Sequence, residues 1–213
     1  MGNPWESIAL SDYEGHMSLG SVQQLQCMNQ IMKVQFDLYP AQSAMVLGIA
    51  GGNGLEHVDS SKYRKVYGVD INPQYLQETE ARYRKLSGIL ECLCLDLISQ
   101  ADRLPHADLL IANLLIEYVG YGVFQNAVQA VHPDYVSCVI QINEGEGFVS
   151  DSPYTHSFDG LSEVHHEMDA ARLTDAMGEI QYGMAATAEY PLPNGKKLVR
   201  LDFCRTDVLH RQG

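Results

Sequence analysis

The sequence predicts an α/β protein with a doubly wound, mostly parallel seven-stranded sheet, a C-terminal antiparallel hairpin and an N-terminal helical cap. Three observations lead to this prediction. Five apolar, β-prone runs alternate with helix-compatible stretches, which is typical of a parallel sheet covered by helices on both faces. A periodic helix precedes the first run. Two more strand-like runs end the chain and are joined at a tight turn.

The first helix is predicted from its periodicity. Over residues 18–39, apolar residues recur every three or four positions, and the pattern stops at Pro40. This spacing places them on one face of a helix. The apolar, β-prone runs then follow at residues 44–49, 66–70, 89–95, 107–113 and 135–143.

The helices between the runs carry their own signals. The clearest begins after Asn72, a good N-cap, has Pro73 in the first helical position and runs to residue 88. Others are expected over residues 121–131 and 169–177. After the last helix, "EIQYGMAATAEYPL" and "KKLVRLDFCRT" flank "PNG", a pattern that indicates an antiparallel hairpin.

No repeat, low-complexity tract or linker divides the chain, so we expect a single domain over residues 1–213. Within it, residues 1–40 form the helical cap and residues 41–213 the core. Residues 144–168 are polar and rich in Gly, Ser and Pro. Loops of that length in a compact domain are often functional.

Composition limits the partners. The chain has neither a basic leader nor an apolar run near 18 residues, so we expect a cytoplasmic protein without a membrane partner. Its five cysteines lack C-x-x-C spacing and are expected to be reduced thiols. A net charge of −13 opposes a phosphate backbone, which disfavours nucleic acid. The sequence gives no oligomeric state.

The stretch "MVLGIAGGNGLEHV" has four glycines within seven residues: Gly48, Gly51, Gly52 and Gly54. A glycine cluster after a buried strand indicates positive φ or a close ligand, and small ligands bind at the carboxyl ends of parallel strands. A dinucleotide fingerprint here would need a third glycine where His57 stands, which disfavours an NAD-dependent oxidoreductase. A phosphate-binding P-loop would need a Lys after Gly54, and none follows.

The loop "VLGIAGGNG" resembles motif I of the class I S-adenosylmethionine-dependent methyltransferases. Three further motifs follow in the family's order: "YGVDINP", "LECLCLDLI" and "ADLLIANLLIEYV". The resemblance covers about residues 45–143, and the final hairpin matches the family's reversed last strand. It implies a Rossmann-like core, S-adenosyl-L-methionine as cofactor and methyl transfer as the activity.

The resemblance also implies roles for individual residues. Asp70 would hold the ribose hydroxyls, with Ile71 packed on adenine. Asp96 would accept from the adenine amino group, and the backbone amide of Leu97 would reach the ring. The remaining implied cofactor residues are Gly48, Ala50, Gly51, Gly52, Asn53, Gly54, Asn113 and Leu114. As alternatives, Asp70 and Asp96 are ordinary strand-end caps, Asn113 caps the next helix, and the glycines serve packing alone.

The motifs depart from the family at one point. The usual acid of motif I corresponds to Gly48, and the first glycine to Ala50. The contact made by that acid is therefore absent or supplied elsewhere. The rest fits the chemistry, because a carboxylate accepts from two vicinal hydroxyls and a sulfonium tolerates no adjacent cation. None of the four motifs contains Lys or Arg.

The acceptor side is less defined. The run N-P-P-[YFW] of family members that methylate nucleobases is missing, since Leu114 follows Asn113. Glu117 and Tyr118 lie just beyond and are the candidate catalytic residues, with Glu117 orienting an amine or acting as a base. The alternative for Glu117 is a solvated glutamate in the first turn of a helix.

Three more residues are candidates for the acceptor pocket or a lid. In "SDYEGHMSLGSV", Tyr13 is expected to face the sulfonium and His16 the methionyl end or acceptor. The alternative is a tail packed along the sheet edge. His156 is a candidate for the acceptor pocket. Adjacent His165 and His166 diverge in any regular structure, so we predict no metal site.

These observations predict an S-adenosylmethionine-dependent methyltransferase acting on an unidentified small-molecule acceptor. One alternative is a non-catalytic protein that binds S-adenosylmethionine without an acceptor. The other is the oxidoreductase disfavoured above.

Overall fold

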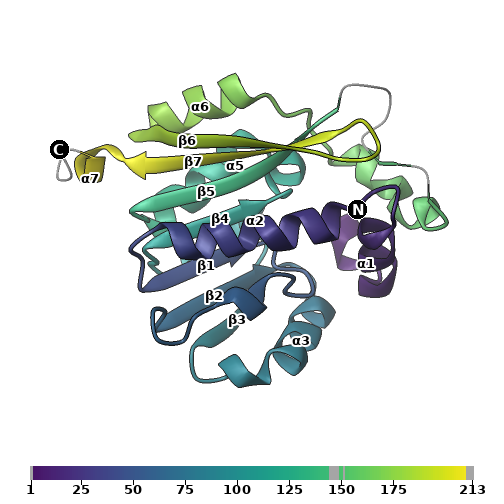
Figure 1. Ribbon diagram of the computed structural model, residues 1–213, viewed down its shortest axis with the longest axis horizontal. Helices are drawn as coiled ribbons and strands as arrows, with labels where there is room; N and C mark the ends of the chain where they lie inside the picture. Colours follow the sequence, from purple (N-terminus) through teal and green to yellow (C-terminus); the bar gives the residue numbers. More distant parts are fainter. Residues whose placement is uncertain (1, 144–148, 151, 210–213) are drawn as a thin grey trace.

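A seven-stranded sheet runs through the molecule in the order β3-β2-β1-β4-β5-β7-β6 (Figure 1). The computed structural model describes residues 2–143, 149–150 and 152–209. Strands β1 to β5 pair in parallel, whereas β7 is antiparallel to both β5 and β6. The predicted fold class is therefore confirmed, including the C-terminal hairpin.

The strands lie close to the predicted runs: β1 Ser43–Leu47, β2 Lys65–Asp70, β3 Leu90–Cys94, β4 Leu109–Asn113, β5 Tyr135–Ile142, β6 Tyr182–Pro191 and β7 Lys197–Arg205. The α-helices are α1 Leu10–Ser18, α2 Gln24–Leu38, α3 Pro73–Arg82, α4 Leu97–Gln100, α5 Ile116–Val131, α6 Ala170–Glu179 and α7 Thr206–Leu209. Short 3-10 helices are η1 Pro4–Glu6, η2 Leu55–His57, η3 Arg84–Leu86, η4 Ala101–Arg103 and η5 Thr155–Glu163.

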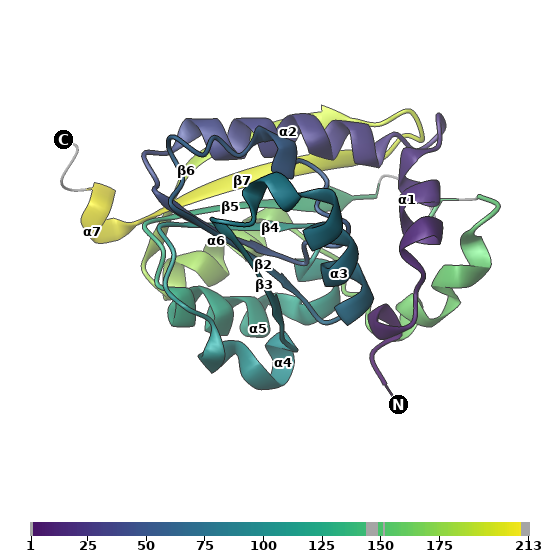
Figure 2. The same cartoon turned by 90° about the horizontal axis from the view of Figure 1, so that it is seen from below.

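Both faces of the central parallel strands β1 and β4 are buried. In β1, Ala44 and Val46 pack with Phe36 of α2, whereas Met45 and Leu47 belong to the core on the opposite face. Figure 2 shows α2 on one side of the sheet and α4, α5 and α6 on the other. Because successive side chains alternate between two apolar layers, these strands have unbroken apolar sequences.

The predicted helix over residues 18–39 is wrong in its first turn. Helix α2 begins at Gln24, because Gln23 has a left-handed φ of 52° and separates it from α1. Val22 lies outside the helix yet is fully buried. As a buried apolar residue, Val22 happened to fit the spacing of three or four residues from which the helix was predicted.

Two later helices differ from their predicted bounds in ways that matter for function. Helix α3 begins as predicted, with the Asn72 Oδ1 accepting from Gln74 N–H (3.0 Å), but it ends at Arg82. Helix α5 begins at Ile116 and is kinked at Gly120, where φ is 76° and ψ is 166°. The kink separates its first turn from the rest of the helix.

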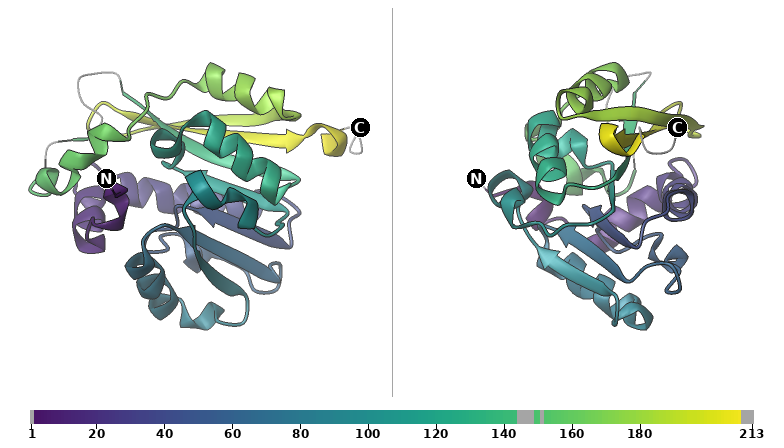
Figure 3. Two further views of the ribbon diagram at one scale, coloured as in Figure 1. Left: turned by 180° about the vertical axis from the view of Figure 1, so that it is seen from behind. Right: turned by 90° about the vertical axis from the view of Figure 1, so that its left-hand side faces the viewer.

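The N-terminal segment lies beyond the carboxyl ends of the parallel strands. Figure 3 shows α1 and η5 together at that end of the sheet, opposite the C-terminus. The residues expected to form a loop at 144–168 thus include a helix, η5, although residues 144–148 and 151 lie outside the described residues. No helix within the described ranges is long and apolar enough to cross a membrane.

Candidate functional site

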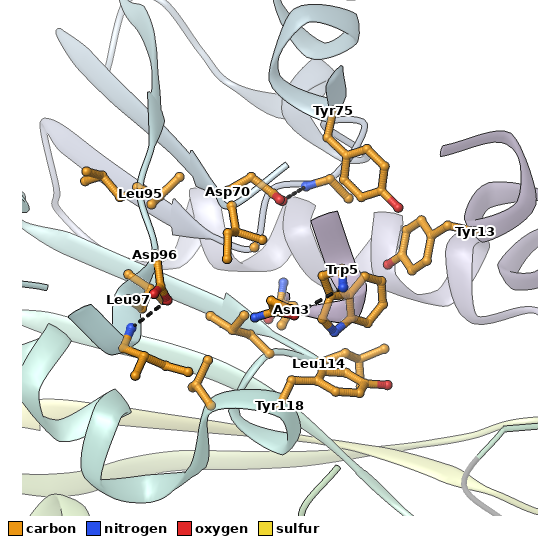
Figure 4. Close-up of a pocket in the computed structure, with 18 residues that line it drawn as sticks. Asn3, Trp5, Tyr13, Asp70, Tyr75, Leu95, Asp96, Leu97, Leu114 and Tyr118 are labelled. Carbon is orange, nitrogen blue, oxygen red and sulfur yellow. Dashed lines mark hydrogen bonds between the residues drawn. The ribbon is translucent and has the colours of Figure 1, made fainter. Parts of the chain in front are cut away.

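A pocket opens where the parallel strands end, and residues following four strands line it (Figure 4). We call it the strand-end pocket. It has about 710 Å³ of space, part of it open to solvent, which is within the usual size range of small-molecule sites. It brings together eight of the cofactor residues that the resemblance implies: Gly48, Ala50, Asp70, Ile71, Asp96, Leu97, Asn113 and Leu114.

The glycine loop takes backbone conformations that side chains disfavour. Gly48, Gly52 and Gly54 have φ of 66°, 78° and 93°, and Ala50 has φ of 47°. A Cβ at Gly48 would also lie 3.1 Å from Leu115 Cδ1. Both features disfavour a side chain at this position.

The rest of the loop lies over a neighbouring hollow, the loop pocket, which Gly51 and Asn53 line together with Glu14 and methionines of α1 and α2. The Asn53 Nδ2 donates to the Leu25 carbonyl (2.9 Å). Gly52 and Gly54 instead pack inward, since a Cβ there would meet Tyr83 and Met32. These two glycines shape the loop without lining the strand-end pocket or the loop pocket.

Asp70 ends β2 and anchors the glycine loop. Its Oδ2 accepts from Ala50 N–H (2.9 Å) and its Oδ1 from Asn72 N–H (2.9 Å). Burial raises the pKa of Asp70, and the backbone N–H donors of Asn72, Ala50 and Ile71 oppose that shift. Each oxygen has further acceptor capacity, so the carboxylate can still accept from a ligand.

Asp96 caps the short helix α4. Its Oδ1 accepts from Ile98 N–H (3.0 Å) and its Oδ2 from Ser99 Oγ (2.8 Å). Asp96 is therefore a helix cap, as the alternative interpretation expected. Asp96 and Leu97 also line the strand-end pocket. Exposed Ile98 adds an apolar wall that the sequence did not single out.

Asn113 does not cap helix α5. Its amide pairs reciprocally with Gln35 of α2, through Oδ1 (2.9 Å) and Nδ2 (2.8 Å). The next residue, Leu114, has a left-handed φ of 53°. It lines the strand-end pocket, the loop pocket and a third hollow that adjoins them. The two residues thus turn the chain from β4 toward α5 at the centre of the site.

A second hollow, the aromatic pocket, adjoins the first and shares Trp5, Tyr13, Leu114 and Tyr118 with it. Glu117 lines the aromatic pocket and is only 4% exposed. It is therefore not the solvated glutamate of the alternative interpretation.

Glu117 is held from two sides. Its Oε1 accepts from Gln141 N–H (2.8 Å), and its backbone carbonyl accepts from His166 N–H (2.7 Å). Its Oε2 is buried and has no hydrogen-bond partner within the described part of the chain. Burial raises the pKa of Glu117 to about 7, although the hydrogen bond from Gln141 lowers it in part.

The N-terminal segment covers both pockets. The Trp5 ring meets Tyr118 edge-on at 4.9 Å and Tyr13 at 5.8 Å between centroids. Figure 4 shows these three rings gathered at one side of the strand-end pocket. His16 lines the aromatic pocket, where its Nδ1 lies 2.8 Å from Ser152 Oγ.

The structure does not bring His156 to the site. Its side chain is 98% exposed and pairs with Asp159 one turn later. Phe158 takes the inward position instead and lines the aromatic pocket. The 3-10 helix η5 carries two ring side chains, those of His156 and Phe158. Only the packing decides which one faces inward.

Sequence reasoning also missed two aromatic residues of the strand-end pocket, Trp5 and Tyr75. Trp5 lies too far from the motifs to be linked to them, and its carbonyl accepts from Asn72 Nδ2 (3.0 Å). Tyr75 lies in the first turn of α3, where its buried Oη has no partner among the described residues. An aromatic residue just after the capped start of α3 was the signal that could have identified it.

The charges suit a cationic ligand. No Lys, Arg or His is among the described residues that line the strand-end pocket. Three or more metal-ligating side chains do not converge anywhere in the described ranges. The pocket therefore combines two carboxylates, those of Asp70 and Asp96, with several rings and a backbone loop.

Comparison with known proteins gives structural matches only. No protein-family model matches the sequence, and no curated protein matches it significantly. Magnesium protoporphyrin IX methyltransferase from Synechocystis PCC 6803, with bound S-adenosylmethionine, has a TM-score of 0.66 and 10% identity, covering 96% of this chain and 98% of that one. The N-methyltransferase NodS from Bradyrhizobium japonicum WM9, in complex with S-adenosylhomocysteine, has a TM-score of 0.66 and 10% identity. The match covers 96% of this chain and 99% of that one.

A third match comes from a protein named for another reaction. The cyclase SpnF has a TM-score of 0.63 and 10% identity, covering 86% of this chain and 82% of that one. At such identities the likeness concerns the fold. The sheet order, the reversed β7 and the nearly complete coverage agree, and the chain therefore has the fold of the class I S-adenosylmethionine-dependent methyltransferases.

Proposed function

We propose that the protein is a methyltransferase that uses S-adenosyl-L-methionine and acts on a small molecule. The observation behind the proposal is the convergence of residues from four strand ends, in the family's order, on one pocket beside a glycine loop. When bound, S-adenosylmethionine supplies an electrophilic methyl group on a sulfonium. A pocket without cations and with aromatic walls is suited to that positive charge.

The residues have distinct tasks in this proposal. Asp70 accepts from the ribose hydroxyls, and the loop amides after Gly52 meet the methionyl carboxylate. Ile71 and Leu97 enclose the adenine, and Asp96 accepts from its amino group. The buried Tyr75 Oη, which lacks a partner among the described residues, gains one from the ligand.

Glu14 of α1 is our candidate for the acid missing from the glycine loop. Its carboxylate lines the loop pocket and pairs with Arg82 directly over Gly51, where a Cβ would meet both side chains. A carboxylate at this place can accept from the methionyl amino group. The contact would then come from the N-terminal cap rather than from motif I.

Two features support a small acceptor. The aromatic pocket lies between α1, the first turn of α5 and η5, and its walls are mostly apolar. The net charge of −13 opposes nucleic acid. Glu117 and Tyr118 face this pocket and are the proposed catalytic residues.

Calorimetry with S-adenosylhomocysteine, S-adenosylmethionine and NADH tests the proposal. We expect the first two to bind to a single site and NADH not to bind. Transfer of labelled methyl groups to small acceptors would then separate an enzyme from a binding protein. Failure of both S-adenosyl compounds to bind would overturn the proposal, and preferred binding of NADH would favour the oxidoreductase.

A further inference from the structure

The aromatic pocket contains an unusual polar atom. Glu117 Oε2 is buried and lacks a hydrogen-bond partner within the described residues, while Oε1 is already engaged by Gln141 N–H. A buried oxygen without a hydrogen-bond partner destabilises the fold. An atom kept at that cost points to a ligand that donates a hydrogen bond to it.

The walls around this oxygen are aromatic. Trp5, Tyr13 and Tyr118 stand at the boundary with the strand-end pocket, and Phe158 lies deeper, 5.0 Å from the His16 ring. Ring faces attract cations, most strongly where water is excluded. A single carboxylate oxygen and several rings together form a site for a positively charged donor.

Within the described residues, the other ionisable groups that line the aromatic pocket do not neutralise Glu117. His16 and His165 line the same pocket, and burial lowers the pKa of both, which keeps them neutral near pH 7. Lys196 also lowers the pKa of both histidines, and burial lowers its own pKa. It is not among the lining residues. The Tyr13 and Tyr118 hydroxyls stay protonated, because burial raises the pKa of each.

We propose that the methyl acceptor is an amine carried on an apolar, preferably aromatic, group, and that Glu117 Oε2 binds and deprotonates its nitrogen. This inference rests on the proposed function. The charged form of Glu117 repels a carboxylate or phosphate acceptor. A neutral alcohol would satisfy Oε2 but would gain nothing from the ring faces as a cation does.

The reaction balances with these groups alone. The bound ammonium gives one proton to Glu117 Oε2, which frees the nitrogen lone pair. That lone pair forms the new C–N bond while the C–S bond of the donor breaks, and the electron pair of the broken bond stays on sulfur. The methylated nitrogen carries the positive charge that sulfur had, and Glu117 later returns its proton to solvent.

Binding to the protein loaded with S-adenosylhomocysteine tests the inference without turnover. The probes are three amines and their matched alcohols: benzylamine and benzyl alcohol, 2-phenylethylamine and 2-phenylethanol, tryptamine and tryptophol. We expect at least one amine to bind about tenfold or more tightly than its alcohol, as a charge-assisted hydrogen bond allows. Near pH 7 its binding should release protons, measured in buffers of different ionisation enthalpy.

Glu117→Gln keeps the acceptor for Gln141 N–H and removes the charge. In this variant we expect the preference for amines and the proton release to disappear, while affinity for S-adenosylhomocysteine is retained. Glu117→Asp should restore part of the proton release. The control is Glu91→Gln, a surface residue paired with Lys65, which should behave as the wild type.

Two results would overturn the inference while leaving the proposed function intact: alcohols binding as tightly as every matched amine, or Glu117→Gln keeping full amine affinity. Transfer of labelled methyl groups only to oxygen or carbon acceptors would do the same. Loss of S-adenosylhomocysteine binding in the wild type would instead overturn the proposed function itself.

Discussion

Two carboxylates, those of Asp70 and Glu117, define the site at the level of single residues. Asp70 accepts one backbone N–H on each oxygen, so its charged form is supported by donors. Burial raises the pKa of both carboxyl groups, but Glu117 accepts on one oxygen only. The carboxylate of Asp70 is thus suited to holding a ligand, and the carboxylate of Glu117 to exchanging a proton.

Replacing Asp70 should weaken the binding of S-adenosylhomocysteine. Asp70→Asn keeps one acceptor oxygen for the loop but loses the charge-assisted bonds to the ribose, each worth about 1.5 to 3 kcal/mol. We expect the affinity to fall about a hundredfold or more. Calorimetry measures it, with Asp59→Asn in an exposed turn as the control. Equal affinities of Asp70→Asn and the wild type would contradict the ribose assignment.

Glu117 should make the ligand-free protein less stable as the pH rises. Its folded pKa of about 7 lies above the ordinary value of 4.5, so the folded state binds more protons between these values. Its contribution to stability is complete below pH 4.5 and is lost as the pH rises through about 7.

Glu117→Gln should therefore be more stable than the wild type at pH 8, by up to about 3 kcal/mol. The advantage should shrink at pH 5. Urea unfolding at the two pH values measures the difference. A difference that does not change with pH would show that Glu117 titrates normally.

At the scale of elements, the cap formed by η1 and α1 closes the site. Ile8 and Met17 of this segment are buried, Tyr13 lines all three pockets, and Glu14 reaches Arg82 of α3. A tail packed along the sheet edge, the alternative interpretation of this N-terminal segment, would not make these contacts. A ligand in the strand-end pocket would lie directly against this segment.

Ligand binding should therefore protect the cap from protease. The chain has no Lys or Arg before Lys33, so chymotrypsin, which can cut after Trp5 and Tyr13, is the suitable probe. We expect S-adenosylhomocysteine to slow cleavage there, and NADH to leave it unchanged. Removing residues 1–17 should weaken binding of S-adenosylhomocysteine while circular dichroism shows a folded core. Equal cleavage with and without ligand, together with full affinity of the truncated chain, would refute a lid.

The strand-end motifs were predictable because strand ends are read from local sequence. A buried run followed by Asp70 or Asp96 fixes where a side chain emerges, and parallel strands bring their ends together. The surroundings of Glu117 were not predictable. They depend on the kink at Gly120 and on the contact from His166, which is distant in sequence.

At the scale of the whole molecule, a buried polar network links the site to the C-terminal hairpin. The Gln35 amide pairs with Asn113 and donates from Nε2 to Ser137 Oγ (2.9 Å). Ser137 Oγ in turn donates to Asp202 Oδ1 (2.5 Å), and Asp202 pairs with Arg200 (3.1 Å). The network spans β4, β5 and β7 beneath α2, so the reversed strand helps to fix the turn after β4.

Ser137→Ala should destabilise the fold by about 1 to 3 kcal/mol, because Gln35 and Asp202 each lose a buried partner. Urea unfolding measures this change. Ser60→Ala, in an exposed turn, serves as the control and should stay within about 0.5 kcal/mol of the wild type. An unchanged unfolding midpoint in Ser137→Ala would show that the network does not stabilise the protein.

A crystal structure with S-adenosylhomocysteine tests the central claim most directly. We expect the ribose at Asp70, the adenine between Ile71 and Leu97, and the sulfur at the boundary near Leu114 and Tyr118, facing Glu117. Electron density for the ligand outside the strand-end pocket, or a sulfur atom turned away from the aromatic pocket, would contradict the proposed methyltransferase site.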